Sequence, residues 1–339
     1  MRPSFHPRLV NGPFDDPALV ISFLLHKRAF LFDPGDLRAL APREALKISH
    51  AFVSHTHMDH FIGFDHLLRL FLGREKHLCL FGPPGFLTNV EGKLSGYTWN
   101  LVGHYTNRFV LEVSEIHPQT LLTRHYRVQD CFRPDPDLQR SPFDGRLLME
   151  PGLIVTVAAL DHRIPSLAFA LQEQFHINIR RDRLEALGLT PGDWLQGFKK
   201  ALFGRQDPAS VFEVPARFAG GRPRPFVLDA LAADIAVTTP GQKIAYIADA
   251  AYSPENIQKM LALADGADHL FIEAAFLEAE RLRARQKFHL TARQAGEIAG
   301  RAGARQVTFF HFSPRYRSGE ALTREAHLAW RSWSAAGPP

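Results

Sequence analysis

The chain has 339 residues, of which 45% are apolar, so it can bury a packed core in one large or two small domains. Its formal charge of +5 favours polyanionic partners without establishing one. The two cysteines, Cys79 and Cys131, form no C-x-x-C pattern, so neither a disulfide framework nor a thiolate zinc site is indicated. The N-terminus lacks the layout of a signal peptide, and no apolar run approaches the ~18 residues that span a bilayer. We therefore expect a cytoplasmic protein without a membrane segment.

Two apolar runs, 19–25 and 29–32, predict the strands of a hairpin joined across residues 26–28. Asp33 follows the second run at the start of an Asp-Pro-Gly turn. Two interpretations of Asp33 are open, because an aspartate at this place can orient a ligand histidine or simply begin the turn.

A dense cluster of metal-ligating residues follows the next apolar run, 51–53. In an extended segment, residues two apart share a face, so His55 and His57 can converge on one cation. The turn that follows then directs Asp59 and His60 toward a second cation. Imidazole and carboxylate ligands at this density suit zinc, and a histidine-rich polar loop would rarely have this spacing at a strand end.

The string SHTHMDHFIG (54–63) resembles the signature of the metallo-β-lactamase superfamily, in the form found in ribonuclease Z, the endonuclease that trims tRNA 3′ ends. A predicted helix over 64–72, a strand over 77–81, a G-P-P-G turn and a helix over 86–99 continue in the same order as in that family. His66 on the first of these helices is interpreted as a helix histidine rather than a ligand. The resemblance implies an α/β fold, a four-layer αβ/βα sandwich of two mixed sheets flanked by helices, with the site at strand ends along one edge.

A strongly apolar strand over 153–160 runs into the string DHRIP (161–165). A histidine at a strand end before an X-Pro turn suits a site, although the pattern alone does not establish a ligand. Ribonuclease Z carries its next metal ligand in a similar strand-H-x-x-P context, so the resemblance implies that His162 is a ligand.

Residues 175–240 are the least regular part of the sequence, with predicted helices over 183–187 and 193–203 and a Gly/Pro/Arg-rich passage over 219–225. Its basic runs fit a solvated face as well as a polyanion-binding surface. Ribonuclease Z inserts its tRNA-binding arm in this interval, but the long glycine-rich arm is not evident here. We expect one metallo-β-lactamase-fold domain over 1–339 with a variable basic insertion at about 175–240.

A strand over 243–248 ends at Asp249, where a carboxylate can bridge two cations about 3.5–4 Å apart. Ribonuclease Z has G-D-T where this chain has Ala248, Asp249 and Ala250, so the carboxylate is kept and a hydroxyl is lost.

The string HLFIEAAF (269–276) resembles the family's H-E-A-T-F element, with Ile272 and Ala275 as departures. Glu273 in this string either orients a histidine or pairs with an arginine, and both interpretations are open.

His289 stands just before a helix that Thr291 and Gln294 begin with a capping-box pattern. The family has H-x-T here, and a histidine so placed can protonate a leaving oxygen. A last apolar strand ends at His311 in the string HFSPRY (311–316), which is similar to the family's terminal ligand motif.

The resemblance implies two Zn²⁺ per chain, with Mn²⁺ as the second choice, since no cysteine takes part and an aspartate bridges. It assigns three ligands to one cation, three to the other and one between them: His55, His57 and His162; Asp59, His60 and His311; and Asp249. It further implies that Asp59 accepts a proton from the attacking water, while His289, supported by Glu273, donates one to the departing ribose 3′ oxygen.

The leading prediction is a dinuclear metal-dependent phosphodiesterase that hydrolyses RNA near the 3′ end of precursor tRNA. The alternative is a hydrolase of the same fold that acts on a small phosphodiester, a cyclic nucleotide or a sulfate ester and has lost tRNA recognition, as the weak arm, Ala250 and Ala275 suggest. A metal-holding binding protein without turnover would lack a ligand or His289, and neither is lacking. The resemblance also implies a homodimer, on which the residues themselves are silent.

Overall fold

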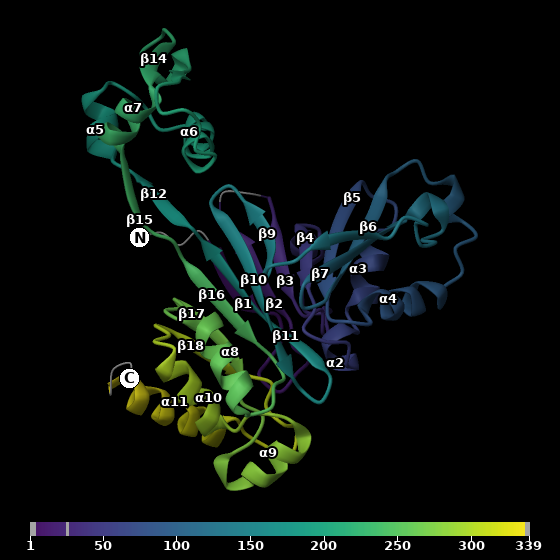
Figure 1. The fold of residues 1–339 in the computed structure, drawn as a ribbon. Coiled ribbons are helices and arrows are strands. Elements are labelled where there is room, and N and C mark those ends of the chain that lie inside the picture. The colour runs from purple at the N-terminus through teal and green to yellow at the C-terminus, as the bar shows by residue number, and fades with distance from the viewer. Residues whose placement is uncertain (1–4, 25–26, 336–339) are drawn as a thin grey trace. The chain divides into compact units, whose positions relative to one another are not determined.

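The computed structural model describes residues 5–24 and 27–335 and divides into two compact units (Figure 1). The larger unit comprises Phe5–Leu147, Val155–Leu171 and the described residues from Lys243 onward. The smaller unit comprises Leu148–Ile154 and Gln172–Gln242. Among the described residues, none of the helices combines the length and the apolar character that a membrane span requires.

The first sheet of the larger unit has eight strands in sequence order. Its four middle strands are parallel to one another and its outer pairs are antiparallel. The predicted hairpin is confirmed, although Leu25 and His26 lie outside the described residues. The strands are β1 (Phe5–Leu9), β2 (Leu19–Phe23), β3 (Ala29–Phe32), β4 (Ile48–Phe52), β5 (Lys76–Gly82), β6 (Phe109–Ile116), β7 (Thr120–Arg127) and β8 (Gln139–Pro142).

Helices cover the outer face of this sheet and form an apolar core with it. In α3, every third or fourth residue is apolar and buried, which places one stripe of the helix against the strands. The helix predicted over 86–99 ends earlier, at Ser95, and the indole of Trp99 folds back to donate to the carbonyl of Leu94. The elements are α1 (Pro42–Ala45), α2 (Met58–Phe61), α3 (Phe64–Phe71), α4 (Phe86–Ser95), η1 (Val102–His104) and η2 (Val128–Asp130).

The second sheet has the strand order β18-β17-β16-β11-β10-β9, and β16, β17 and β18 are parallel. Because these strands run in one direction, their carboxyl ends meet at one edge, from which several site residues project. The strands are β9 (Arg146–Glu150), β10 (Leu153–Asp161), β11 (Pro165–Glu173), β16 (Lys243–Ile247), β17 (His269–Glu273) and β18 (Val307–Phe310).

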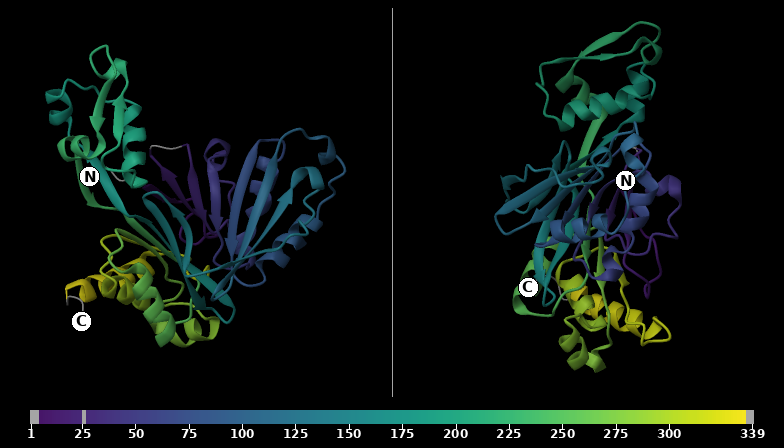
Figure 2. Two further views of the ribbon diagram at one scale, coloured as in Figure 1. Left: turned by 45° about the horizontal axis from the view of Figure 1, so that its top comes forward. Right: turned by 90° about the vertical axis from the view of Figure 1, so that its right-hand side faces the viewer.

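Figure 2 shows helices of the C-terminal third on the outer side of the second sheet, coloured green to yellow. The predicted capping box of Thr291 and Gln294 is present, and Ser253 caps α8 by accepting from the N–H of Asn256. At Gly296 an added Cβ would lie 2.1 Å from the carbonyl of Ala326, so only glycine permits the close approach of two helices here. The elements are α8 (Pro254–Ala264), η4 (Glu278–Glu280), α9 (Arg281–Lys287), α10 (Ala292–Arg301) and α11 (Glu320–Ala335).

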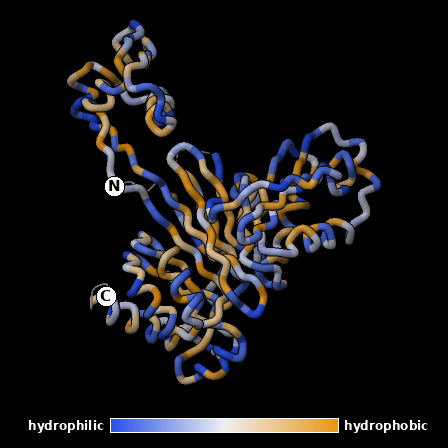
Figure 3. The backbone as a smooth tube through the Cα atoms, in the orientation of Figure 1, coloured by the Kyte–Doolittle hydropathy of each residue, from blue (hydrophilic) through white to orange (hydrophobic). Residues whose placement is uncertain are grey.

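The inner faces of the two sheets meet through aromatic rings. Phe169 of the second sheet lies 5.6 Å, between ring centroids, from both Phe32 and Phe52 of the first sheet, and Tyr246 lies 5.9 Å from Phe32. Figure 3 shows this concentration of hydrophobic residues along the central strands. The predicted four-layer sandwich of two mixed sheets between helices is confirmed.

The smaller unit is more regular than the sequence suggested. Two antiparallel strand pairs and three helices enclose a core of their own, in which Trp194, Phe198 and Phe212 pack with ring centroids 5.5–6.2 Å apart. Its elements are β12 (Phe175–Ile179), α5 (Arg181–Ala186), α6 (Trp194–Phe203), β13 (Val211–Val214), η3 (Ala216–Phe218), β14 (Arg224–Val227), α7 (Leu228–Ile235) and β15 (Ala236–Pro240).

Candidate metal centre and active site

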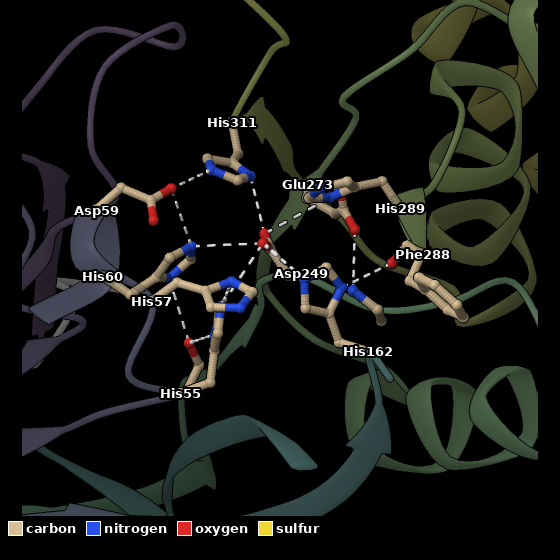
Figure 4. A network of polar contacts seen from close by, with 12 residues as sticks. His55, His57, Asp59, His60, His162, Asp249, Glu273, Phe288, His289 and His311 are labelled. Carbon is tan, nitrogen blue, oxygen red and sulfur yellow. Dashed lines mark hydrogen bonds and ion pairs between the residues drawn. The ribbon is translucent and has the colours of Figure 1, made fainter. Parts of the chain in front are cut away.

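The larger unit brings every predicted site residue to one edge of the sandwich (Figure 4). Each of them lies within a regular element or close to the end of one, so the backbone that holds it is supported by a strand or a helix. The residues and their positions are His55, after β4; His57, Asp59 and His60, at and within α2; His162, after β10; Asp249, after β16; Glu273, at the end of β17; His289, before α10; and His311, after β18.

One group of four ligand atoms comes from His55, His57, His162 and Asp249, all within 4.8 Å of one another. The Nε2 atom of His55 lies 2.8 Å from Nδ1 of His57 and 3.7 Å from Oδ2 of Asp249. Nε2 of His162 lies 3.5 Å from the same carboxylate oxygen. The arrangement is the one expected for three imidazoles and a carboxylate around one cation.

A second group joins Asp59, His60 and His311. Oδ2 of Asp59 lies 3.6 Å from Nε2 of His60 and 3.2 Å from Nε2 of His311. Asp249 borders this group too, since its Oδ2 is 3.5 Å from Nε2 of His60 and its Oδ1 is 2.8 Å from Nδ1 of His311. Figure 4 shows Asp249 at the centre of both groups, which is the position of a bridging carboxylate.

Unsatisfied polar atoms provide a test of whether these residues suit a cation. Nε2 of His60, Oδ1 of Asp249 and Nδ1 of His311 are buried and make no well-formed hydrogen bond, although the last two lie 2.8 Å apart as an ion pair. Leaving a buried polar atom without a hydrogen bond costs about 1–3 kcal/mol, so this arrangement is unfavourable unless a shared ligand binds these atoms. Nitrogen and carboxylate donors without a thiolate fit Zn²⁺ and, second, Mn²⁺.

Neighbouring side chains fix the orientation of the candidate ligands. Asp33 accepts hydrogen bonds from Nδ1 of His60 at 2.9 Å, from the hydroxyl of Ser54 at 2.8 Å and from the hydroxyl of Tyr246 at 2.8 Å. Of the two interpretations of Asp33, the structure supports the carboxylate that orients a histidine. Nδ1 of His162 donates to the carbonyl of Phe288 at 2.8 Å, which leaves Nε2 to face Asp249.

Glu273 is fully buried and orients His289. Its Oε2 accepts from Nδ1 of His289 at 3.0 Å, and its Oε1 accepts from the backbone N–H groups of Ala250 at 2.9 Å and Leu290 at 3.2 Å. The structure therefore supports the first of the two interpretations of Glu273. Ala250 lacks the hydroxyl found in the family but contributes its backbone donor to the same network.

Burial and neighbouring charges shift the pKa values of the site residues in different directions. Burial lowers the pKa of His55 to about 2, which keeps its ring neutral. Burial opposes the ionisation of Asp249, but His311, His60 and His289 hold its pKa well below the usual range. Burial also lowers the pKa of His289, but the carboxylates of Glu273 and Asp249 outweigh it, so the net shift is upward. A protonated His289 beside ionised carboxylates is suited to act as an acid.

Left-handed backbone is concentrated at this site. Of the seven described non-glycine residues with positive φ, four lie in the site or next to one of its residues: Asp33 (51°), Arg163 (64°), Phe288 (60°) and His311 (58°). This conformation is unfavourable for residues with a Cβ and persists where the surrounding contacts impose it. At Asp33, Arg163 and His311 it turns the chain just after a strand, and at Phe288 it ends α9.

A cavity of about 300 Å³ opens beside Asp59, His289 and His311. An adjoining pocket of about 320 Å³ also contacts His289 and is lined by three basic residues, Arg283, Lys287 and Arg315. The sequence shows Arg283 and Lys287 in a basic run over 281–287 and Arg315 in the terminal ligand motif, but it does not show that they line a pocket beside His289. No role was predicted for Ser54 or Tyr246. The signal for Tyr246 was a polar-tipped residue within an apolar strand that ends at a ligand.

The sequence of this chain is similar to one family model and to individual proteins named ribonuclease Z. Residues 171–312 match the family model described as a beta-lactamase superfamily domain. The protein is 31% identical over 287 residues to ribonuclease Z of Deinococcus radiodurans, covering 84% of this chain and 81% of the relative. It is 26% identical to ribonuclease Z of Methanothermobacter thermautotrophicus, covering 88% and 81%.

Solved structures show the same fold. A metallo-β-lactamase fold protein of Bacillus subtilis, YhfI, aligns over 96% of this chain and 94% of its own with a TM-score of 0.54 and 14% identity. The short form of human tRNase Z aligns over 93% of both chains with a TM-score of 0.52 and 18% identity. Together with the curated relatives, the fold and the ligand geometry lead to one conclusion: the chain belongs to the ribonuclease Z family of the metallo-β-lactamase superfamily.

Proposed function

We propose that this protein is a metal-dependent endoribonuclease that cleaves precursor tRNA near its 3′ end. One observation carries the proposal: two groups of metal-ligating residues lie next to each other, and Asp249 contacts residues of both. The Glu273–His289 pair lies in the same site. The relatives named ribonuclease Z, which align over more than four fifths of the chain, support tRNA as the substrate.

Two metal ions, Zn²⁺ first and Mn²⁺ second, are proposed to bind the seven ligands given above. When bound, such a pair activates one water and neutralises charge that grows on the phosphodiester. The oxygen atoms of Asp59 reach the cavity, since the side chain is 42% exposed, so Asp59 can accept a proton from the attacking water.

His289 is proposed as the acid that protonates the departing ribose 3′ oxygen. Its Nδ1 is occupied by Glu273, so Nε2 is the nitrogen available to substrate, and the ring lines both pockets. Glu273 has two effects: it fixes the direction of the ring and it raises the pKa of His289.

The basic pocket beside His289 is proposed to hold RNA phosphates. Arg283 and Arg315 are 53% and 37% exposed, and both face Glu280, which limits their mobility without removing their positive charge from solvent.

We further propose one metallo-β-lactamase-fold domain over 1–339, in which the basic insertion at about 175–240 contributes to RNA binding through exposed arginines such as Arg217, 65% exposed. A homodimer in the cytoplasm completes the proposal, and sedimentation analysis would test the oligomeric state.

Cleavage of a precursor tRNA with a 3′ trailer by the zinc-loaded protein tests the function. We expect cutting at the trailer junction by the wild type and none by His57→Ala. A bis-aryl phosphodiester serves as the second substrate. If the wild type hydrolyses only the small diester, tRNA processing is ruled out, and the alternative hydrolase of a small phosphodiester or related ester takes its place.

A further inference from the structure

Four metal-ligating side chains gather on one face of the first sheet, outside the active site: His77 and Cys79 on β5, Glu112 on β6 and His125 on β7. The three strands are neighbours (Figure 1), and Cys79, Glu112 and His125 stand opposite one another in the register. His77 is two residues before Cys79 and therefore points to the same face of the sheet. All four residues belong to the larger unit.

The ligand atoms of His77, Cys79 and Glu112 lie close enough together to share a single ion, and His125 contacts this group through Glu112. Oε2 of Glu112 lies 3.1 Å from Nε2 of His77 and 3.4 Å from Nε2 of His125. Sγ of Cys79 lies 3.9 Å from Nε2 of His77, and the ligand atoms of His77, Cys79 and Glu112 are all within 4.8 Å of one another. In a tetrahedral zinc site, metal–ligand bonds of about 2.0–2.3 Å place neighbouring ligand atoms about 3.3–3.6 Å apart.

The chemistry of this donor set selects the class of ion. Two imidazoles, one thiolate and one carboxylate favour Zn²⁺ and similar late first-row divalent ions over Mg²⁺ and Ca²⁺, which prefer oxygen ligands. The site is accessible to ions from solution, since the side chains of His77, Glu112 and His125 are 55%, 29% and 21% exposed. Three ligands are in place, and His125, whose Nε2 lies 3.4 Å from Glu112, supplies the fourth when its side chain turns toward the ion. Four protein ligands leave no open position for a substrate, so the expected role is structural.

This cluster is separate from the catalytic groups. It lies in the first half of β5 and on the adjoining strands, whereas the catalytic ligands follow strand ends and include no cysteine. The missing C-x-x-C pattern counted against a thiolate zinc site at the outset. Sheet register, rather than sequence spacing, brings Cys79 together with its neighbours here.

We propose that His77, Cys79, Glu112 and His125 bind a structural Zn²⁺, additional to the catalytic ions, that joins β5, β6 and β7. On binding, the thiol of Cys79 releases its proton to solvent, because the thiolate is the form that binds metal. The proposal does not depend on the substrate of the enzyme.

Cobalt substitution tests the proposal, since a thiolate ligand gives Co²⁺ a charge-transfer band in the near-ultraviolet and the catalytic groups contain no thiolate. Titration of the metal-free full-length protein with Co²⁺ is expected to produce this band in the wild type and in Cys131→Ser, but not in Cys79→Ser. The zinc content of Cys79→Ser is expected to fall by one ion per chain. Absence of the band in the wild type, its persistence in Cys79→Ser, or its appearance only in large excess of cobalt would overturn the proposal.

A second measurement keeps the test valid if Cys79→Ser does not fold. Zn²⁺ is expected to slow the alkylation of Cys79 at least tenfold in the wild type and much less in His77→Ala, with the modified cysteine identified by peptide mapping. His104→Ala, which removes an exposed histidine elsewhere on the larger unit, is the matched control and should keep the protection. Equal alkylation rates with and without Zn²⁺ in the wild type would contradict the proposal, as would unchanged protection in His77→Ala.

Discussion

The two histidine clusters of this protein differ in how they are held. At the active site, two candidate ligands and the proposed acid each have a second partner: His60 has Asp33, His162 has the carbonyl of Phe288, and His289 has Glu273. The cluster on β5 to β7 has the ligand types but a more exposed setting, and its geometry comes from strand register alone. The difference indicates that catalysis requires fixed ring directions, whereas a structural ion requires only suitable donors within reach.

The largest expected effect comes from the carboxylate that both catalytic groups share. Asp249→Asn should lower RNA cleavage by about 10³-fold or more, since metal ions contribute several kcal/mol to transition-state stabilisation and about 1.4 kcal/mol is tenfold in rate. Zinc content should fall as well. Asp65→Asn is the control, because Asp65 pairs with Lys93 away from the ligands. Full activity with unchanged zinc in Asp249→Asn would refute the bridging role.

The next effect separates catalysis from metal binding. His289→Ala should reduce kcat about 10²–10⁴-fold, the usual contribution of general acid catalysis, while zinc content stays unchanged. Single-turnover cleavage and metal analysis on the same sample would measure both. Loss of zinc in this variant would mean that His289 is a ligand rather than an acid.

The pH dependence follows from the pair of Glu273 and His289. A general acid works when protonated, so activity should be present below the pKa of His289 and fall as the pH rises through it. Glu273 raises that pKa, and Glu273→Gln should therefore move the alkaline limb of the kcat profile to lower pH. An alkaline limb that stays in place in Glu273→Gln would assign it to another group.

Metal binding should release a proton from His60. Burial lowers the pKa of His60, but the carboxylates of Asp249 and Asp33 outweigh it and raise the pKa to about 10, so in the metal-free protein this ring is charged at neutral pH. Zinc must displace that proton, so its apparent affinity should rise with pH. Calorimetry in two buffers of different ionisation enthalpy would count the protons, and an affinity that does not change between pH 6 and 8 would contradict the assignment.

The smallest expected effect concerns the basic pocket. Lys287→Ala should weaken RNA binding and lower the slope of log affinity against log salt by about one, as expected when one phosphate contact is lost. Hydrolysis of a bis-aryl phosphodiester should be unchanged, because the small substrate has no flanking phosphates. Arg305→Ala, which removes an arginine that pairs with Asp268, is the control, and an equal loss of RNA binding in both variants would show only a net-charge effect.

Much of the active site could be predicted because most of its residues follow strands, and the ends of parallel strands meet at one edge of a sheet. The strings around His55, His162, Asp249 and His311 each followed an apolar strand, and the family resemblance supplied their order. The choices left open at Asp33 and Glu273 depended on partners 27 and 16 residues away, which only the tertiary structure identifies.

Other features had no sequence signal of sufficient strength. The cluster at Cys79 depends on which residues stand opposite one another across three strands, and register cannot be read from composition. The insertion at about 175–240 was predicted, but not that it folds around a core of its own, because the residues of that core are spread among turns and basic runs. Physical contact, rather than a local pattern, defines both.

The left-handed backbone at Asp33, Arg163, Phe288 and His311 bears on any attempt to engineer the enzyme for heat resistance. Glycine at Phe288 would remove about 1–2 kcal/mol of conformational strain, although the loss of side-chain packing opposes that gain. The same change would make the backbone at position 288 more mobile, and with it the carbonyl that orients the ring of His162. A gain in thermal stability at this position would therefore come with a less well-oriented candidate ligand. Directed evolution for stability should therefore leave these four positions fixed and seek its gains on the outer helices.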